Sequence, residues 1–255
     1  MVEINRVFVR GDCHGDFDWL EEWCEENETT TNDILILLGD SALRFEGNSS
    51  AKEEARKIRV SHCPVTIFAV RGNHDRPFID PFKEEVELVE CQYLDHNHND
   101  NILMWHDNRY NNIWYFNEDN PIYYIKNKSF CILPGAYSVD KEWRQLMHWP
   151  WYEDEQLSYH QRLDYLDRIY DRSFDFVLSH TCPYEWRPTD LFLSSIDQSK
   201  VDNSTEYWLS DVKKYIGYKY WYFGHYHANR DYGKVSEYDW NGETIMLFDE
   251  VRRIL

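Results

Sequence analysis

Five short motifs in this chain contain residue types that bind metal ions and transfer protons. They are Asp12-Cys13-His14, Gly39-Asp40, Gly72-Asn73-His74-Asp75, Ser179-His180 and Gly224-His225-Tyr226-His227. The side chains that offer a carboxylate, an amide oxygen or an imidazole as a ligand are Asp12, His14, Asp40, Asn73, His180, His225 and His227. Such a mixed oxygen and nitrogen set suits Mn²⁺, Fe²⁺ or Zn²⁺. It is too large for one tetrahedral ion but suits two ions that share a carboxylate, an arrangement used for phosphoryl displacement.

Each motif follows a short apolar run that is typical of a buried strand. These runs cover 6–9, 34–38, 65–70, 174–178 and 220–223. A glycine at a strand end permits a sharp turn, so the next side chains emerge at the carboxyl edge of the sheet. Because open α/β sheets hold their ligands at that edge, the five motifs are expected to meet there.

Helical patterns separate these strands and predict a layered α/β fold. The expected helices cover 17–24, 50–62, 158–171 and a segment from 203 or 204 to 215, and Asp16 is the expected N-cap of the first. Further strands are expected near 112–116, 123–126 and 129–133. A C-terminal hairpin is expected from strands at 235–240 and 243–249, joined by a type I′ turn at Asn241-Gly242.

The segment 76–125 has a weaker pattern, interrupted by Pro77 and Pro81 and by asparagine-rich patches. It predicts either an insertion that caps the site or a hairpin at the edge of a sheet. His96 and His98 within it offer two imidazoles, but no further ligand cluster follows them. We therefore interpret these two histidines as residues of a surface loop.

Composition limits the class of partner. The 255 residues are 42% hydrophobic, which suits one globular domain over 1–255. A net charge of −19 argues against nucleic acid and against an anionic membrane, although a local metal-lined pocket can still bind a small phosphoester. The six cysteines show no C-x-x-C spacing and indicate reduced thiols. With no signal peptide and no apolar run near the roughly 20 residues of a membrane span, a cytoplasmic location is expected.

In their order, the motifs resemble those of the calcineurin-like metallophosphoesterase superfamily, which are D-x-H, G-D, G-N-H-[DE], H and G-H-x-H. All five are complete and span positions 11–227. The resemblance implies an α/β core of two stacked mixed β-sheets flanked by helices. The ligands that it implies are Asp12, His14, Asp40 and His227 for one ion, and Asp40, Asn73, His180 and His225 for the other. Asp40 would then bridge the two ions, and His74 would be a proton donor and not a ligand.

The expected reaction is hydrolysis of a phosphoester. Two cations clamp the phosphate oxygens and lower the pKa of a bound water, and the metal-bound hydroxide attacks phosphorus in line. His74, beside Asn73, is placed to protonate the leaving oxygen. Asn73 and Arg44 are the candidate substrate-binding residues. Arg44 stands four residues after Asp40, where protein phosphatases of this superfamily carry the arginine of G-D-x-V-D-R-G, and the alternative is a surface arginine.

Two departures separate this chain from the Ser/Thr protein phosphatases. Leu43 stands where their motif has its second aspartate, and Asp75 stands where they have glutamate. We therefore predict a metal-dependent phosphoric ester hydrolase of the wider superfamily that acts on small phosphoesters with two divalent ions. Mn²⁺ is favoured over Fe, Zn or Ni. Ser/Thr protein phosphatase-like activity, nucleotide phosphodiesterase activity and a non-catalytic metal-binding scaffold are the alternatives.

Overall fold

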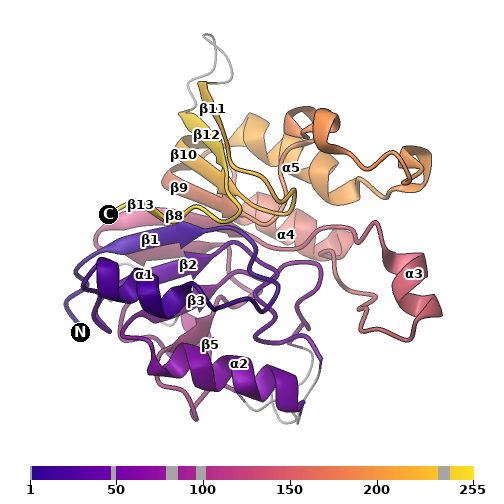
Figure 1. Ribbon diagram of the computed structural model, residues 1–255. Coiled ribbons are helices and arrows are strands. Elements are labelled where there is room, and N and C mark those ends of the chain that lie inside the picture. The colour runs from indigo at the N-terminus through magenta and orange to yellow at the C-terminus, as the bar shows by residue number, and fades with distance from the viewer. Residues whose placement is uncertain (1, 47–49, 79–85, 96–101, 235–241) are drawn as a thin grey trace.

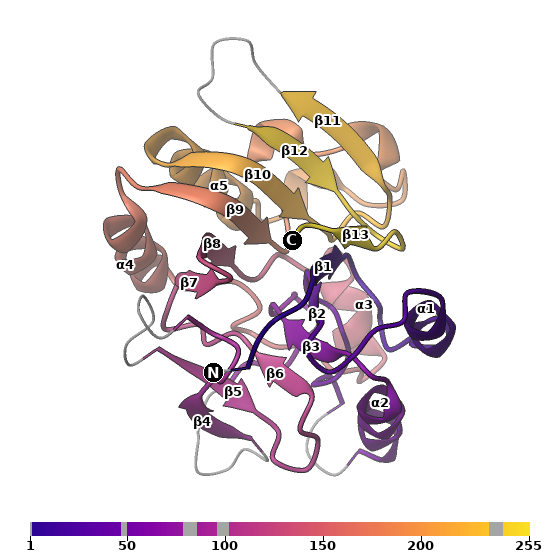
Figure 2. The same cartoon turned by 90° about the vertical axis from the view of Figure 1, so that its left-hand side faces the viewer.

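Two mixed β-sheets lie face to face in this protein, with helices on the outer face of each (Figure 1). The computed structural model describes residues 2–46, 50–78, 86–95, 102–234 and 242–255. Figure 2 shows the layers from the side, with α1 and α2 against one sheet and α4 and α5 against the other. The expected α/β sandwich of two stacked mixed sheets is confirmed.

The first sheet has seven strands among the described residues, in the order β13-β1-β2-β3-β6-β5-β4. Their bounds are β1 Val7–Arg10, β2 Ile34–Leu37, β3 Thr66–Ala69, β4 Glu87–Glu90, β5 Leu103–His106, β6 Ile113–Tyr115 and β13 Arg252–Arg253. The strands β1, β2, β3 and β6 run parallel to one another, and β13, β5 and β4 are antiparallel to their neighbours.

The second sheet has six strands within the same described ranges, in the order β11-β12-β10-β9-β8-β7. Their bounds are β7 Ile122–Ile125, β8 Lys128–Leu133, β9 Ser173–Ser179, β10 Gly217–Phe223, β11 Arg230–Lys234 and β12 Glu243–Met246. The central strands β8, β9, β10 and β12 are parallel, and β7 and β11 are the antiparallel edges.

The helices that cover the sheets are amphipathic. They are α1 Leu20–Glu26, α2 Ala51–His62, α4 Tyr159–Ile169 and α5 Ser204–Tyr215. The short helix α3, Lys141–Leu146, projects away from both sheets at the right of Figure 1. Three 3₁₀ turns, η1 Tyr184–Trp186, η2 Thr189–Leu191 and η3 Gln198–Lys200, lie between β9 and α5. None of the described helices is long and apolar enough to cross a membrane.

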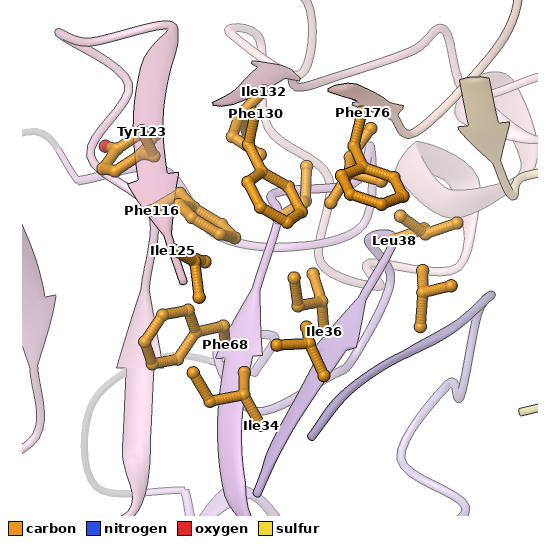
Figure 3. Packing of buried hydrophobic residues seen from close by; sticks show 14 of the residues in the cluster. Ile34, Ile36, Leu38, Phe68, Phe116, Tyr123, Ile125, Phe130, Ile132 and Phe176 are labelled. Atoms are coloured by element: carbon orange, nitrogen blue, oxygen red, sulfur yellow. The ribbon is translucent and has the colours of Figure 1, made fainter. Parts of the chain in front are cut away.

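The strand β2 shows how the sequence produces these layers. Its side chains Ile34 and Ile36 lie in the apolar cluster between the two sheets, together with Phe130 of the second sheet (Figure 3). Its alternate side chains Leu35 and Leu37 lie in a second cluster, which includes residues of α1 and α2. A strand that is buried on both faces needs apolar residues at every position, which explains the continuous run that predicted it.

Three of the expected helices, α2, α4 and α5, lie close to their predicted ranges, and side-chain caps mark the starts of the first two. Ser50 accepts a hydrogen bond from Glu53 N at the start of α2. Ser158 and Gln161 form a reciprocal capping box at the start of α4. The exception is α1, which begins at Leu20 and not at 17, so the prediction that Asp16 caps it is wrong. The Asp16 carboxylate instead accepts a hydrogen bond from Asp18 N at 3.0 Å in the preceding turn.

The described part of 76–125 extends the first sheet and does not cap the site. β4 pairs antiparallel with β5, β5 pairs with β6, and β6 lies beside β3, so the edge-hairpin alternative is the one observed. Met104 and Trp114 bury their side chains in the cluster between the sheets, which ties this segment to the core. His96 and His98 lie outside the described residues.

The C-terminal hairpin differs from the prediction in its first strand. β11 covers Arg230–Lys234 and pairs antiparallel with β12, whereas the sequence predicts that strand at 235–240. Residues 235–240 and Asn241 of the predicted turn lie outside the described residues. Gly242 lies so close to the backbone of β10 that an added Cβ would sit 1.6 Å from Lys219 O.

Candidate metal centre

The structure brings together the ends of five strands, three from the first sheet and two from the second. Asp12 and His14 follow β1, Asp40 follows β2, and Asn73 and His74 follow β3. From the second sheet, His180 follows β9, and His225 and His227 follow β10. All seven ligand candidates named from the sequence therefore belong to turns at carboxyl ends of central strands.

One group of ligand atoms is formed by Asp12, His14 and His227, which lie within 4.8 Å of one another. The two imidazole Nε2 atoms of His14 and His227 are 2.8 Å apart. The carboxylate Oδ2 of Asp12 is 3.4 Å from His227 Nε2 and 3.7 Å from His14 Nε2.

A second group lies beside the first and shares Asp12 with it: Asp12, Asp40 and His180 also lie within 4.8 Å of one another. His180 Nε2 is 3.7 Å from Asp40 Oδ1 and 2.8 Å from Asn73 Oδ1. The ring of His225 lies 5.0 Å from that of His180, between centroids. Because Asp40 Oδ2 is also 4.0 Å from His14 Nε2, Asp40 lies between the two groups.

The hydrogen bonds of the second group leave lone pairs facing each other. His180 Nδ1 is 2.7 Å from the carbonyl oxygen of Leu38, which can only accept, so in the neutral imidazole the proton is on Nδ1 and Nε2 carries a lone pair. The Asn73 amide nitrogen donates to Ser138 Oγ at 2.9 Å, which turns the Asn73 oxygen toward that lone pair. In the first group, Asp12 Oδ2 is buried and accepts no well-aligned hydrogen bond from the described residues. Such a concentration of lone pairs fits bound divalent cations.

The carboxylates are strongly perturbed by this arrangement. Asp12 and Asp40 are only 1% and 2% exposed. Burial, together with the charge of Asp12, raises the pKa of Asp40. Burial and the charge of Asp40 raise the pKa of Asp75 to about 6. Three carboxylates in so small a volume repel one another, and cations would relieve this repulsion.

The backbone around the site is held in uncommon conformations. Four ligand candidates, His14, Asp40, His225 and His227, have φ values of 47°, 48°, 70° and 50°, in the left-handed region. Single residues of this kind are sparsely populated and occur at functional sites, where the surrounding structure holds them. The backbone N–H of His74 donates to Asp40 Oδ1, and that of His225 donates to Asp12 Oδ1, both at 2.8 Å.

Asp75 stabilises the turns that carry these ligands. Its carboxylate accepts hydrogen bonds from Gly72 N at 3.0 Å, Ala42 N at 3.1 Å and Ser41 Oγ at 3.3 Å. It thus connects the turn after β2 to the turn after β3. The sequence placed Asp75 in a motif, but only the structure shows this role.

His74 lies next to Asn73, as expected, and its Nε2 is 3.9 Å from Asp40 Oδ2. Arg144 Nη2 lies 3.1 Å from the same His74 nitrogen. Since a guanidinium can only donate, His74 Nε2 is the acceptor there. Burial and the positive charge of Arg144 lower the pKa of His74 to about 3, so this imidazole is neutral at pH 7.

Sequence reasoning missed Arg144, and no sequence signal marks it. It lies in α3, outside all five motifs and 70 positions from His74. Its Nε atom donates to Asp140 Oδ2 at 2.7 Å, which orients the guanidinium.

Arg44 occupies a different position from the one expected. Its side chain is 2% exposed, and its guanidinium carbon lies 3.8 Å from the ring centroid of Phe78. Its Nε and Nη2 atoms lie 3.4 Å from the carbonyl oxygens of Arg76 and Pro77. It does not line the cavity beside the ligand candidates. Arg44 is therefore buried and is not the surface arginine of the alternative, and its role as a phosphate ligand stays a prediction.

A cavity of about 430 Å³ opens beside the site. Asp40, Asn73, His74, His225 and His227 form one side of it. Other lining residues are Tyr137, Val139 and Asp140 and residues of the loop between η1 and α5. None of the described residues of 76–125 lines this cavity, so the expected cap is supplied by other segments.

Comparison with known protein families matches residues 6–229 to the calcineurin-like phosphoesterase family. The matched range includes all five motifs and every ligand candidate. A search of curated proteins found no match.

The backbone of Gly72 lies close to the metal-ligand candidate Asp40, and a substitution at Gly72 tests this geometry. A Cβ at Gly72 would lie 2.1 Å from Asp40 Oδ1 and 2.4 Å from Asp40 N, so Gly72→Ala must displace Asp40. We expect Gly72→Ala to weaken binding of Mn²⁺, measured by titration calorimetry, by at least about tenfold, as loss of ligand orientation does at other metal sites.

Gly233→Ala is the matched control. Gly233 has a φ of +60°, but its added Cβ would meet no atom within 4 Å. This variant should lose about 1–2 kcal/mol of stability through backbone strain and keep the affinity for Mn²⁺. Unchanged affinity in Gly72→Ala would contradict the placement of Asp40 at the centre of the site.

Proposed function

This chain belongs to the calcineurin-like phosphoesterase family, and we propose that it hydrolyses small phosphoesters with two divalent metal ions. Family membership makes the protein a metal-dependent phosphoester hydrolase. The two-ion centre is supported by one observation above all: two groups of ligand atoms share the buried carboxylate Asp12, and the buried carboxylate Asp40 of the second group lies 4.0 Å from His14 of the first.

In this proposal, Asp12, His14, Asp40 and His227 hold one ion, and Asp40, Asn73, His180 and His225 hold the other. Bound divalent ions would neutralise phosphate oxygens and make a coordinated water more acidic. Mn²⁺ is the proposed ion because the ligands are carboxylates, an amide oxygen and imidazoles, without a thiolate.

The residues of the chain orient this centre. Leu38 O fixes the tautomer of His180, and Ser138 fixes the amide of Asn73. Such outer hydrogen bonds hold ligands in a productive orientation before substrate arrives. Asn73 faces the cavity as well, so it is also positioned to contact a phosphate oxygen.

His74 is the proposed proton donor to the leaving oxygen. Its place in the cavity wall beside Asn73 supports this role. The neutral state of His74 in the free protein argues against this role, since burial and the charge of Arg144 disfavour the imidazolium that would donate the proton. A bound phosphate adds negative charge, which both raises the pKa of the imidazole and attracts the Arg144 guanidinium. We therefore propose that Arg144, through its contact with the cavity residue His74, supplies the arginine that reaches the phosphate.

The cavity and the net charge support a small substrate. A volume of about 430 Å³ is typical of a small-molecule site. The net charge of −19 opposes the many phosphate contacts that give nucleic acids their affinity. A cytoplasmic location is also proposed, because all six cysteines are free and buried, as in proteins of reducing compartments.

The bridging role of Asp40 predicts unequal effects of two ligand variants. His14→Ala removes a ligand of one proposed ion, whereas Asp40→Asn alters a ligand of both. Titration calorimetry with Mn²⁺ should find two ions per wild-type chain and one tightly bound ion in His14→Ala. Asp40→Asn should weaken both ions by more than about tenfold. Loss of only one ion in each variant would exclude a bridging Asp40.

The role of His74 predicts loss of turnover without loss of metal. His74→Asn should retain two Mn²⁺ per chain, while kcat on p-nitrophenyl phosphate falls by about 10²–10⁴-fold, the usual contribution of general acid–base catalysis. His160→Asn is the control, because His160 is an exposed residue of α4 and should keep full turnover. A substoichiometric metal content in His74→Asn would make His74 a ligand instead.

The proposed substrate size predicts a preference among phosphoesters. Steady-state rates on p-nitrophenyl phosphate, its bis ester, mononucleotides and a labelled oligonucleotide should show the highest kcat/KM for a small ester. Raising salt from 50 to 200 mM should reduce kcat/KM on that ester by less than about fivefold, because a single phosphate is engaged. If the oligonucleotide had the highest kcat/KM, the argument from charge would be wrong.

A further inference from the structure

A buried carboxyl group with an unused oxygen lines the cavity beside the metal centre. Glu206, in the first turn of α5, is 4% exposed. Its Oε1 accepts a hydrogen bond from Thr181 Oγ1 at 2.9 Å. Its Oε2 is buried and has no hydrogen-bond partner among the described residues. A buried polar atom of this kind is costly unless a partner arrives.

The cavity that Glu206 lines also carries apolar side chains. Leu191, Phe192, Ile196 and Val201, from the loop before α5, are among them. His74, Asn73 and other residues of the metal centre line the same cavity. A phosphoester bound with its phosphate at that centre would therefore place its leaving group in a space that these apolar residues and Glu206 line.

No cation of the described chain neutralises Glu206 by a direct ion pair. Arg187 also lines the cavity, but it stacks on Tyr184, with 3.5 Å from its guanidinium carbon to the ring centroid. Its Nε donates to Tyr184 O at 3.0 Å, and its Nη1 donates to Asn203 Oδ1 at 2.5 Å. The guanidinium is thus directed at other acceptors. Burial raises the pKa of Glu206, although the hydrogen bond from Thr181 and the charge of Arg187 partly oppose this effect.

We propose that Glu206 is a specificity-determining residue that binds an amino group on an apolar leaving group. The inference rests on the proposed phosphoesterase function and defines its substrate class: phosphoesters of aryl or alkyl alcohols that carry an amine remote from the phosphate. An amine suits the site because an ammonium group both donates to Oε2 and compensates the buried charge. A leaving group without a donor would bury Oε2 unpaired, and sites built in this way reject such analogues strongly.

Three matched pairs of phosphate monoesters test the proposal. The amine members are 3-(aminomethyl)phenyl, 4-(aminomethyl)phenyl and 4-(2-aminoethyl)phenyl phosphate. Their partners, 3-ethylphenyl, 4-ethylphenyl and 4-propylphenyl phosphate, replace the amino group by a methyl group. The wild-type enzyme with Mn²⁺ should show at least tenfold higher kcat/KM for the amine member of one or more pairs. The ratio of kcat/KM between the two members of a pair isolates recognition of the amine, because a general change in turnover affects both members equally.

Glu206→Gln should reduce this ratio by at least about tenfold, because the carboxamide keeps the size of the side chain but loses its charge. Glu22→Gln is the control, since Glu22 is exposed in α1, on the other sheet, and this variant should keep the wild-type ratio. Circular dichroism and thermal unfolding would verify that both variants fold.

Each other outcome decides against the proposal. Wild-type ratios within about threefold in all three pairs would overturn it without any variant, while hydrolysis of the alkyl members would leave the proposed function intact. A preference that survives in folded Glu206→Gln would assign amine recognition to another group. If the wild-type protein hydrolysed neither these esters nor p-nitrophenyl phosphate, the proposed function itself would fail, and this inference with it.

Discussion

Two buried carboxylates, Asp12 and Asp40, impose the main constraint on this structure. They lie in one small volume with almost no exposure to solvent, and the pKa of Asp40 is raised by burial and by the charge of Asp12. Such groups are stable only when hydrogen-bond donors and cations surround them. The backbone N–H groups of His74 and His225 satisfy one oxygen of each, and the opposing oxygens remain available to ions.

The sandwich architecture explains how these charges can be held together. Two sheets pack through a continuous apolar cluster, and each contributes central parallel strands whose carboxyl ends meet at the same place. The turns there need left-handed residues and close backbone approaches, which are unfavourable in isolation. The buried strands on either side provide the packing energy that offsets this cost.

The other residues discussed for the site lie outside these turns and are free of this constraint. Arg144 lies in the projecting helix α3, and Glu206 lies in the first turn of α5, after the long loop that contains η2 and η3. The core motifs therefore carry the phosphoester chemistry of the family, whereas the contacts proposed to distinguish one substrate from another come from residues outside the motifs. Both apolar residues and the polar ligand candidates line the cavity.

The amino-acid sequence by itself determined the central strands, the helices that cover them and the ligand candidates. These features depend on local signals: continuous apolar runs, capping serines such as Ser50, and polar residues directly after strands. The sequence did not reveal that Arg44 is buried against Phe78, that Arg144 contacts His74, or that Glu206 faces the cavity. Those positions result from packing between segments far apart in the chain. Contacts between such segments produce no repeating pattern in the sequence from which they could be predicted. Local chemistry was therefore predictable, but the choice of which charged residues enter the site was made by the tertiary structure.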